Sequence, residues 1–473
     1  MKETDIRQPN TVQTILSTCA CKLTRNVLRL LGRGGTALPG KVAMKIAPNI
    51  LARASAGMEV IVVTGTNGKT TTARMLSEAY AAAGKECITN KSGANLLSGV
   101  TAEFVTAADW RGRPKSGYAV IECDEGALKQ VVPLCRPKVI VVTNLFRDQL
   151  DRYGEVTHTL EEIRKGIEKV PDTILCLNAD CSLTSSLGRE GRNPVVYYGV
   201  DEPQGIQEEP PLSDATHCIV CGEKYAYEYY TYAHLGGFYC PSCGYRRMAP
   251  QFAVTKVGQM NAAGSDFLLR YKEENGTETS VDKETEVHVA IPALYNIYNA
   301  AAATTAFVSA GHAAEDMFRV LETVESSFGR METFHIDGKM IQMILVKNPA
   351  GCNQAVTYLN QMTEPFTLAL LLNDRTADGH DVSWIWDVDY ESLAGNDLIR
   401  RILLSGDRAE DLQIRLKYAG VSKEKLYLSH DLQTFTTKLL SEEGPVFVLP
   451  NYTTMLLLRA ELAKRAGKDA YWN

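Results

Sequence analysis

The stretch from Met58 to Gly84 restricts the possible fold more than any other part of this sequence. It starts with the apolar run Val60–Val63, turns at two glycines, and continues from Lys69 as an Ala-rich helical pattern. A buried strand, a glycine turn and a helix N-terminus together form a cradle for phosphate. Glycines let backbone N–H groups approach an anion, and the helix start carries partial positive charge. The stretch therefore predicts an α/β domain that binds a nucleoside triphosphate.

The spacing of this phosphate loop is G-x-x-G-K-T, two residues shorter than the usual P-loop. Lys69 supplies a charge for the β- and γ-phosphates, and Thr70 supplies a hydroxyl suited to Mg²⁺. We expect the nucleotide to contact the whole loop, which consists of Gly65, Thr66, Asn67, Gly68, Lys69, Thr70 and Thr71. The alternative is an ordinary Gly-rich turn between a strand and a helix, and the Lys-Thr pair at the helix start argues against it.

After this loop the sequence alternates between strand and helix patterns, which is typical of a parallel-rich sheet covered by helices on both faces. The predicted strands are Val60–Val63, Tyr118–Cys123, Val139–Thr143 and Ile174–Leu177. Ligands of such sheets lie at the carboxyl ends of the strands. Glu122 directly follows a buried run at one strand end, so we expect it to hold Mg²⁺ together with Thr70. A solvated loop charge is the alternative.

Four cysteines form two C-x₂-C-G motifs in the middle of the chain. They are Cys218, Cys221, Cys240 and Cys243. Four thiolates complete a tetrahedral zinc site without an open position, so the predicted zinc is structural. The segments Tyr225–Tyr232 and Phe238–Tyr239 are the expected strands of a zinc ribbon, inserted at about residues 214–248. We expect the nearby His217 and His234 on the surface.

A helix predicted to start near Pro292 and to run to about Ala310 carries Asn296 and Asn299 on one face. Their side-chain amides donate and accept hydrogen bonds, which suits the edge of an adenine base. Capping of the helix start is the alternative. Further along, Arg330 is expected in a turn, from which its guanidinium can reach a terminal phosphate.

From about Phe334 the strand and helix patterns resume, which predicts a C-terminal α/β domain of Rossmann-like type. One of its loops, Asn373–Asp387, carries two tryptophans and four aspartates directly after a buried strand, and we interpret it as a site or an interface. An acidic loop with core tryptophans is the alternative. We therefore expect three parts, namely a helical lead-in at 1–57 packed on the central domain, the central domain at 58–330, and the C-terminal domain at 331–473.

Bulk composition narrows the functional classes. The chain of 473 residues is too long for one core, and its net charge of −6 argues against a nucleic-acid binder. No apolar run is long enough to cross a bilayer, and the N-terminus is polar, so we expect a cytoplasmic protein. The segment Val12–Leu31 mixes apolar and basic residues at helical spacing. It is either a docking helix or a basic amphipathic face for a membrane surface or an anionic lipid.

Taken in order, these motifs resemble those of the Mur ligase superfamily, which joins amines to carboxylates through an acyl phosphate made with ATP. The segments that carry the likeness are Thr64–Thr71, Glu122, Arg147–Gly154, Tyr295–Asn299 and Gly329–Glu332. Within the superfamily the chain is similar to the MurT family, the ligase-like subunits of lipid II isoglutaminyl synthase. This closer likeness lies in the zinc ribbon and in the segments Leu30–Gly40, Asn348–Gln354 and Asp378–Asp387.

The resemblance implies ATP-dependent amidation of the α-carboxylate of D-glutamate in the stem peptide of lipid II, giving D-isoglutamine for peptidoglycan synthesis. Lys69 and Glu122 would be catalytic, and Arg330 would stabilise the transferred phosphoryl group. Thr70 and Glu122 would hold Mg²⁺. Because lipid II is linked to the membrane, the resemblance also implies a peripheral contact with the inner face of the cell membrane.

A separate GatD-like glutaminase subunit is implied as the source of ammonia. This sequence has no glutaminase motif of its own, since Cys352 lies in an expected Asn-Pro-Ala-Gly turn and no His-x-Glu segment is present. In the family, an aspartate of the ligase-like subunit completes the Cys-His pair of the partner, as in other catalytic triads. We assign this role to Asp381, with Asp378 and Asp387 as alternatives and Asp374 in the same loop.

Two departures from other Mur ligases bear on the substrate and the metal. Fewer than sixty residues precede the strand of the phosphate loop, which is too few for a uridine-nucleotide domain. Gln149 replaces the histidine of the usual D-H-L-D motif, which puts a second Mg²⁺ site in doubt.

The alternative function is a partner-independent Mur-like or folylpolyglutamate-synthase-like ligase that adds a free amino acid. A zinc-ribbon ATPase that binds nucleic acid is disfavoured, because Glu223 and Glu228 dilute the basic residues near the ribbon.

Overall fold

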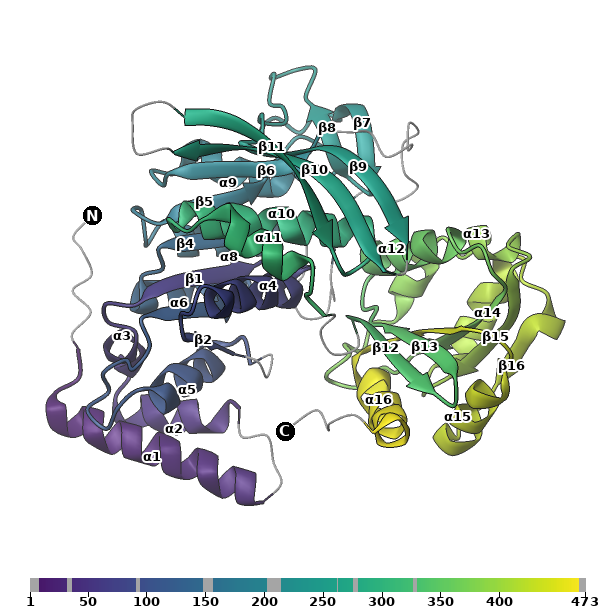
Figure 1. Ribbon diagram of the computed structural model, residues 1–473, viewed down its shortest axis with the longest axis horizontal. Helices are drawn as coiled ribbons and strands as arrows, with labels where there is room; N and C mark the ends of the chain where they lie inside the picture. The colour runs from purple at the N-terminus through teal and green to yellow at the C-terminus, as the bar shows by residue number, and fades with distance from the viewer. Residues whose placement is uncertain are drawn as a thin grey trace. The chain divides into compact units, whose positions relative to one another are not determined.

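The computed structural model describes residues 8–31, 36–90, 94–147, 156–201, 214–261, 263–274, 280–325 and 330–467. They divide into two compact units (Figure 1). Unit 1 covers residues 1–145 and 157–324, and unit 2 covers residues 146–156 and 325–473. Among the described residues, no helix combines the length and the apolar character needed to cross a bilayer.

Unit 1 is built around a sheet in the strand order β11-β10-β9-β6-β5-β4-β1-β3-β2. Its strands are β1 (Glu59–Thr64), β2 (Cys87–Thr89), β3 (Tyr118–Glu122), β4 (Val139–Val142), β5 (Ile174–Asn178), β6 (Val195–Val200), β9 (Phe252–Asn261), β10 (Gly264–Glu274) and β11 (Ser280–Val289). Along the sheet, the neighbours in the order β9-β6-β5-β4-β1-β3-β2 pair in parallel. The strands β9, β10 and β11 form an antiparallel extension. The predicted parallel-rich sheet is therefore present.

The sequence of β1 explains its place inside the sheet. Val60–Val63 are fully buried, which requires cover on both faces of the sheet. On one face α4 and α10 pack against each other and against the strands (Figure 1). The helices of unit 1 that follow the lead-in are α4 (Lys69–Ala82), α5 (Leu97–Ala107), α6 (Leu128–Cys135), α8 (Val156–Ile167), α9 (Ser182–Glu190), α10 (Leu294–Ser309) and α11 (Ala314–Leu321).

The N-terminal lead-in consists of α1 (Thr11–Leu30), α2 (Leu38–Ile46) and α3 (Ile50–Ala54), and it packs on α5. The Ser17 hydroxyl donates to the carbonyl of Ala43 at 2.9 Å, and Arg25 pairs with Glu103 at 3.1 Å. The side of α1 that faces the protein carries small residues, which are Thr14, Ser17, Thr18 and Cys21. The helix thus docks mainly through a small polar face, and Leu16, Leu23 and Leu30 are exposed.

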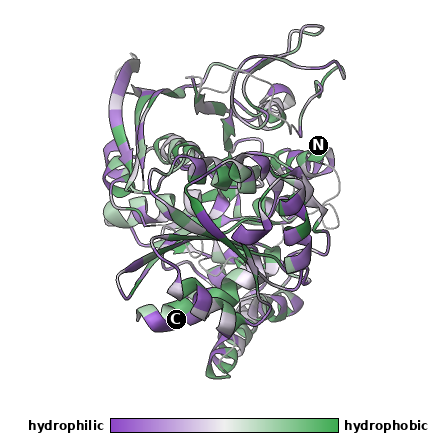
Figure 2. Cartoon of the chain, turned by 90° about the vertical axis from the view of Figure 1, so that its right-hand side faces the viewer, coloured by the Kyte–Doolittle hydropathy of each residue, from purple (hydrophilic) through white to green (hydrophobic). Residues whose placement is uncertain are grey.

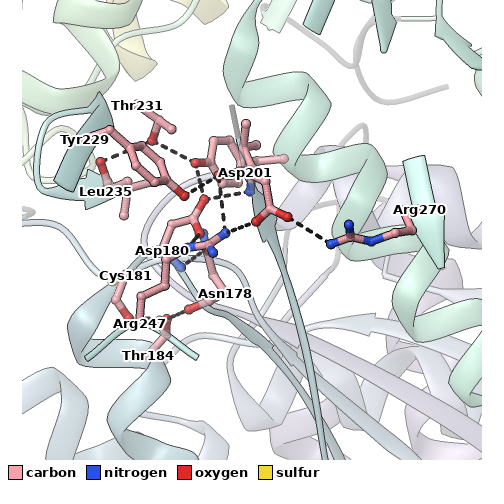
Figure 3. Close-up of polar contacts among 12 residues, drawn as sticks. Asn178, Asp180, Cys181, Thr184, Asp201, Tyr229, Thr231, Leu235, Arg247 and Arg270 are labelled. Carbon is pink, nitrogen blue, oxygen red and sulfur yellow. Dashed lines mark hydrogen bonds and ion pairs between the residues drawn. The ribbon is translucent and has the colours of Figure 1, made fainter. Parts of the chain in front are cut away.

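The insertion with the four cysteines contains the hairpin of β7 (Ala226–Tyr232) and β8 (Leu235–Tyr239), close to the predicted strands. A buried ion pair attaches this insertion to the sheet, as Figure 3 shows. Arg247 donates through Nε to Oδ1 of Asp180 at 2.6 Å, and Tyr298 of α10 donates to Oδ2 at 2.5 Å. Burial raises the pKa of Asp180, and the charge of Arg247 opposes that rise.

His234 contradicts the sequence-based expectation of a surface residue. It is fully buried, and its Nε2 lies 3.6 Å from Sγ of Cys181, whereas His217 is exposed as expected. The reason is the position of the β7–β8 hairpin against the main sheet, which no local pattern around His234 indicates. Although burial opposes it, the contact with His234 lowers the pKa of Cys181.

Unit 2 is a second α/β layer with the strand order β12-β13-β17-β14-β15-β16, parallel except for the antiparallel pair β12–β13. Its strands are β12 (Arg330–Ile336), β13 (Lys339–Ile344), β14 (Phe366–Leu371), β15 (Ile399–Ser405), β16 (Leu426–Leu428) and β17 (Val446–Pro450). Its helices are α12 (Pro349–Asn360), α13 (Glu391–Ala394), α14 (Ala409–Tyr418), α15 (Leu432–Ser441) and α16 (Tyr452–Ala466), with 3₁₀ turns at Ser383–Asp387 and Lys423–Lys425. Green apolar and purple polar segments alternate along its elements in Figure 2, as expected when each element buries one side.

Two expectations for this region were wrong. Arg330 was expected in a turn but is the first residue of β12. Cys352 was expected in a turn but lies in α12, where the Asn348 side chain caps the helix by accepting from the N–H of Gly351 at 2.9 Å. The Asn-Pro sequence starts a helix here because proline fits the first helical position. Burial raises the pKa of the Cys352 thiol to about 12, which makes it a poor nucleophile.

The ion pair under the ribbon leads to a stability prediction with a matched control. Replacing Arg247 by Ala leaves the carboxylate of Asp180 buried without its cation, so we expect a loss of about 3–5 kcal/mol in the free energy of unfolding of unit 1. Arg246 is its neighbour, but its side chain is 63% exposed and lies 3.7 Å from Glu228, so Arg246→Ala is expected to have no measurable effect. Urea unfolding followed by far-UV circular dichroism tests this. Equal midpoints for the two variants would contradict it.

Candidate active site

The phosphate loop joins the carboxyl end of β1 to the N-terminus of α4, as predicted. The end of β4 holds it from one side. The N–H of Thr66 donates to the Asn144 carbonyl at 2.8 Å, and that of Asn67 donates to the Asn144 side-chain oxygen at 2.9 Å. The Thr143 hydroxyl donates to the Asn67 carbonyl at 2.6 Å. Contacts from a neighbouring strand therefore fix the loop's backbone and direct its path into the helix.

Close packing explains why the last loop position before α4 is glycine. Gly68 has φ +86°, and a Cβ there would collide with the side-chain oxygen of Asn299 on α10. Asn299 in turn donates to Asn296 at 3.0 Å, and Asn296 donates to the Pro292 carbonyl at 2.7 Å. The two predicted asparagines therefore lie together, both buried, against the phosphate loop.

Lys69 lies at the first position of α4 and is buried. Its ammonium donates to Oε1 of Glu125 at 2.7 Å and also to the carbonyl of Gly65. Burial raises the pKa of Glu125, and the charge of Lys69 opposes that rise. Glu125 follows β3 and was not assigned a role from sequence, although it belongs to an acidic cluster at a strand end. The contact between Glu125 and Lys69 could not be predicted from sequence, because it depends on the parallel pairing of β1 with β3.

Thr70 and Glu122 meet where β3 ends beside α4. The Thr70 hydroxyl donates to Oε2 of Glu122 at 2.7 Å, and the Glu122 carboxylate is mostly buried. Asn90 holds the backbone of Glu122 on both sides, accepting from its N–H at 2.9 Å and donating to its carbonyl at 2.8 Å. A hydroxyl and a carboxylate that converge in this way are the hard oxygen donors that Mg²⁺ prefers, so the residues fit the ion.

Arg330 is the remaining residue that the sequence predicts to bind phosphate. The side chain of Arg330 lies outside the described residues, and only its backbone at the start of β12 is described. Its neighbour Glu332 forms a buried ion pair with Arg459 of α16, with N–O distances of 2.9 and 3.0 Å. Gln149 also falls outside the described residues.

The four cysteines come together as the sequence predicted. Their Sγ atoms all lie within 4.8 Å of one another, with Cys218 and Cys243 at 3.6 Å and Cys221 and Cys240 at 3.5 Å. A tetrahedral zinc with Zn–S bonds of about 2.3 Å sets sulfur atoms about 3.8 Å apart. Both knuckles turn through left-handed glycines, at φ +78° for Gly222 and +74° for Gly244. The cluster fits a structural zinc ion.

The aspartates of the loop after β14 differ in their surroundings. Asp378 is buried and accepts from the N–H of Thr453 at 2.8 Å, and burial raises its pKa. Asp387 forms an ion pair with Arg147, and Asp374 lies 3.8 Å from Arg408. Asp381 is half-buried and accepts from the N–H of Ser383 at 2.9 Å. Hydrogen bonds with the side chain and the N–H of Ser383 lower the pKa of Asp381. Three of the four therefore pair with another segment, and Asp381 bonds within its own turn.

Comparison with protein families covers both units. The family model described as "Mur ligase middle domain" matches residues 63–221. The family model described as "MurT ligase C-terminal" matches residues 345–455. A curated relative from Streptococcus pneumoniae, "Lipid II isoglutaminyl synthase (glutamine-hydrolyzing) subunit MurT", is 35% identical over 96% of this chain and 98% of its own length. The protein of the same name from Staphylococcus aureus (strain COL) is 33% identical over 93% of this chain and 96% of its own length.

Solved structures give the same architecture. MurF from Acinetobacter baumannii superposes with a TM-score of 0.65 at 17% identity, over 90% of this chain and 80% of that one. A pseudomurein peptide ligase type C from Methanothermus fervidus gives a TM-score of 0.61 at 19% identity, over 86% and 79% of the two chains. At this level of identity the likeness concerns the fold alone. The predicted α/β fold of Mur ligase type, with its four-cysteine insertion and C-terminal α/β domain, is confirmed.

The contact between Gly68 and Asn299 leads to a binding prediction. Gly68→Ala adds a methyl group where the Asn299 side chain lies, so the loop must shift, and we expect the affinity for MgATP to fall about tenfold or more. Gly84→Ala is the matched control, because Gly84 also has a positive φ of +71° but open space around its Cβ position. Its left-handed strain costs about 1–2 kcal/mol of stability without touching the loop. Titration with a fluorescent ATP analogue compares the two, and equal affinities would contradict the prediction.

Proposed function

Because this chain belongs to the family of MurT subunits of lipid II isoglutaminyl synthase, we propose that it amidates the α-carboxylate of D-glutamate in the stem peptide of lipid II. One observation carries the proposal. The likeness to the pneumococcal subunit extends over 96% of this chain and 98% of that one, so it includes both the phosphate loop and the aspartate loop. The product is D-isoglutamine within the peptidoglycan precursor.

The proposed reaction has two steps. A carboxylate oxygen of the substrate attacks the γ-phosphorus of ATP, which forms an acyl phosphate as the bond to ADP breaks. Ammonia then adds to the acyl carbon, phosphate leaves, and loss of a proton gives the amide. The first step brings two anions together, so its barrier depends on cationic and hydrogen-bonding groups held in place beforehand.

The residues of the phosphate site have distinct roles in this proposal. Lys69 offsets the charge on the γ-phosphate, and the loop N–H groups at the start of α4 bind the β-phosphate. Glu125 holds the Lys69 ammonium in the site through their 2.7 Å contact. Mg²⁺, when bound, neutralises phosphate charge, and Thr70 and Glu122 are the residues that would hold it. Asn296 and Asn299 would bind the adenine edge, and Arg330 the terminal phosphate.

Ammonia comes, in the proposal, from a GatD-like glutaminase subunit. The buried Cys352, with its raised pKa, offers no nucleophile for glutamine hydrolysis in this chain. Asp381 remains our choice to complete the partner's Cys-His pair, because an aspartate that orients a histidine must keep its carboxylate accessible. The contacts of Asp378 with Thr453 and of Asp387 with Arg147 favour this choice. The four-cysteine cluster would bind structural zinc, and the complex would act at the inner face of the membrane.

The role of Lys69 is tested by substitution. Lys69→Ala should lower the rate of ATP-dependent amidation about a hundredfold or more, since it removes a charge aimed at the transferred phosphoryl group. Lys256→Ala, an exposed lysine on β9, is the control and should keep full activity. If the single variant is unstable because Glu125 loses its partner, Lys69→Ala/Glu125→Gln removes the second charge as well. Phosphate release with lipid II and ammonium measures the rate, and unchanged turnover in folded Lys69→Ala contradicts the ligase assignment.

The partner-dependent step is tested separately. With the glutaminase subunit present, Asp381→Asn should lower glutamine-driven amidation about a hundredfold or more and leave ammonium-driven amidation unchanged. Asp378→Asn and Asp387→Asn serve as comparisons in the same loop. Equal loss with both nitrogen sources would remove Asp381 from the triad role, and selective loss in a comparison variant would move the role to that residue.

A further inference from the structure

Helix α1 presents an apolar stripe away from the protein. The exposed apolar side chains of α1 and of Leu31, which directly follows it, have exposed fractions between 37% for Ile15 and 87% for Leu30. They are Val12, Ile15, Leu16, Leu23, Val27, Leu30 and Leu31. They recur at intervals of one, three, four and seven residues, which places them along one side of a helix. The helix has 20 residues and is therefore about 30 Å long. Contiguous exposed apolar surface of this extent marks an interaction site.

The stripe is not needed to attach α1 to unit 1. The opposite side, with Thr14, Ser17, Thr18 and Cys21, is buried against α2 and α5. Polar contacts also fix the helix, because Lys22 donates to the Ala108 carbonyl at 2.6 Å and Arg25 pairs with Glu103. Figure 1 shows α1 along the margin of unit 1, beside α2 and α5. Helix α1 therefore buries small polar residues and leaves exposed leucines available for contact with an apolar surface outside unit 1.

The apolar surface continues beyond the helix. An apolar groove of about 600 Å³ lies between α1, the end of α2 and the loop after α5, and its lining includes Leu16, Leu23, Ile46 and Trp110. The indole of Trp110 is 61% exposed, and the Lys22 ammonium lies 5.0 Å from its ring centroid. Tryptophan is enriched where apolar membrane interior meets water.

Basic residues predominate around this surface. Between Ile6 and Met58 the sequence contains no Asp or Glu and eight Lys or Arg, in a chain whose net charge is −6. Exposed basic residues there and beside Trp110 are Arg29, Lys41, Lys45, Arg111 and Arg113. Of the nearby acids, Glu103 pairs with Arg25, and Asp109 accepts from the N–H groups of Arg111 and Arg113 at 2.8 Å each. The surface is complementary to an anionic partner.

We propose that the α1 stripe, together with Trp110 and these basic residues, docks unit 1 on an anionic lipid bilayer, with α1 lying parallel to the membrane plane. An apolar helix face with basic residues beside it is the combination that binds the boundary between headgroups and acyl chains. The inference deepens the proposed function and rests on it, because a substrate linked to a lipid lies in that membrane. The surface would hold the catalytic unit close to a substrate that cannot leave the bilayer.

Vesicle flotation with the full chain tests the proposal. The wild type should bind vesicles of phosphatidylglycerol and phosphatidylcholine, bind pure phosphatidylcholine about tenfold less, and be released as NaCl rises from about 0.1 to about 1 M. Leu16→Ser/Leu23→Ser and Lys41→Glu/Lys45→Glu should each weaken binding about tenfold or more. The control is Ile414→Ser/Leu457→Ser in unit 2, which alters side chains exposed to 48% and 45% and should bind like the wild type.

The other outcomes overturn the proposal. They are absence of wild-type binding to anionic vesicles, equal binding by the stripe variants, and binding lost equally in the unit 2 control. If Leu16→Ser/Leu23→Ser keeps vesicle binding and changes only the sedimentation coefficient, and therefore the oligomeric state, the stripe is a protein interface.

Activity with a stem peptide that lacks the lipid separates this inference from the proposed function. The stripe variants should keep that activity and lose amidation of vesicle-embedded lipid II, whereas a wild type inactive on the peptide would count against the ligase assignment alone.

Discussion

The parallel pairing of β1 between β3 and β4 is the constraint on which the candidate active site depends. Ile61–Val63 pair with both neighbours and are buried, so the three strands end at the same edge of the sheet. That edge receives the phosphate loop from β1, the carboxylates of Glu122 and Glu125 from β3, and the Asn144 contacts that hold the loop from β4. A shift of one strand by one residue would reverse which side chains face the loop. Register thus decides whether the cationic and acidic groups meet.

A second set of contacts joins the four-cysteine insertion to the nucleotide side of unit 1. Asp180 accepts from Arg247 of the insertion and from Tyr298, which precedes Asn299 on α10. One buried carboxylate therefore fixes both the insertion and the helix that packs against the phosphate loop. Its cost of burial is offset by the cation and by the N–H of Val200. The insertion is too small for a large core, so this anchor and the cluster of four thiols hold it in place.

The sequence predicted best those features whose chemistry is local. The loop spacing, the four cysteines and the strand end at Glu122 could be identified because each depends on neighbouring residues. Elements without strong periodicity escaped prediction, such as the three-residue β2 and the strand β6. Arg330 and Cys352 were placed in turns because glycine and proline near them favour turns, whereas β12 and α12 include them through pairing with β13 and capping by Asn348. The buried state of His234 likewise depends on a hairpin that packs against a distant part of the chain.

By itself the sequence determined the class of fold, the phosphate loop with Lys69 and Thr70, the thiol cluster and membership of the Mur ligase superfamily. These follow from spacing, and spacing is a property of the chain before it folds. Only the tertiary structure decided that Glu125 pairs with Lys69, that Asn299 packs on Gly68, and that α1 turns its leucines outward. Each of these depends on which surfaces compete for burial, and that competition involves residues tens or hundreds of positions apart. A helical pattern shows that a helix has an apolar side, but only packing decides which side faces the protein.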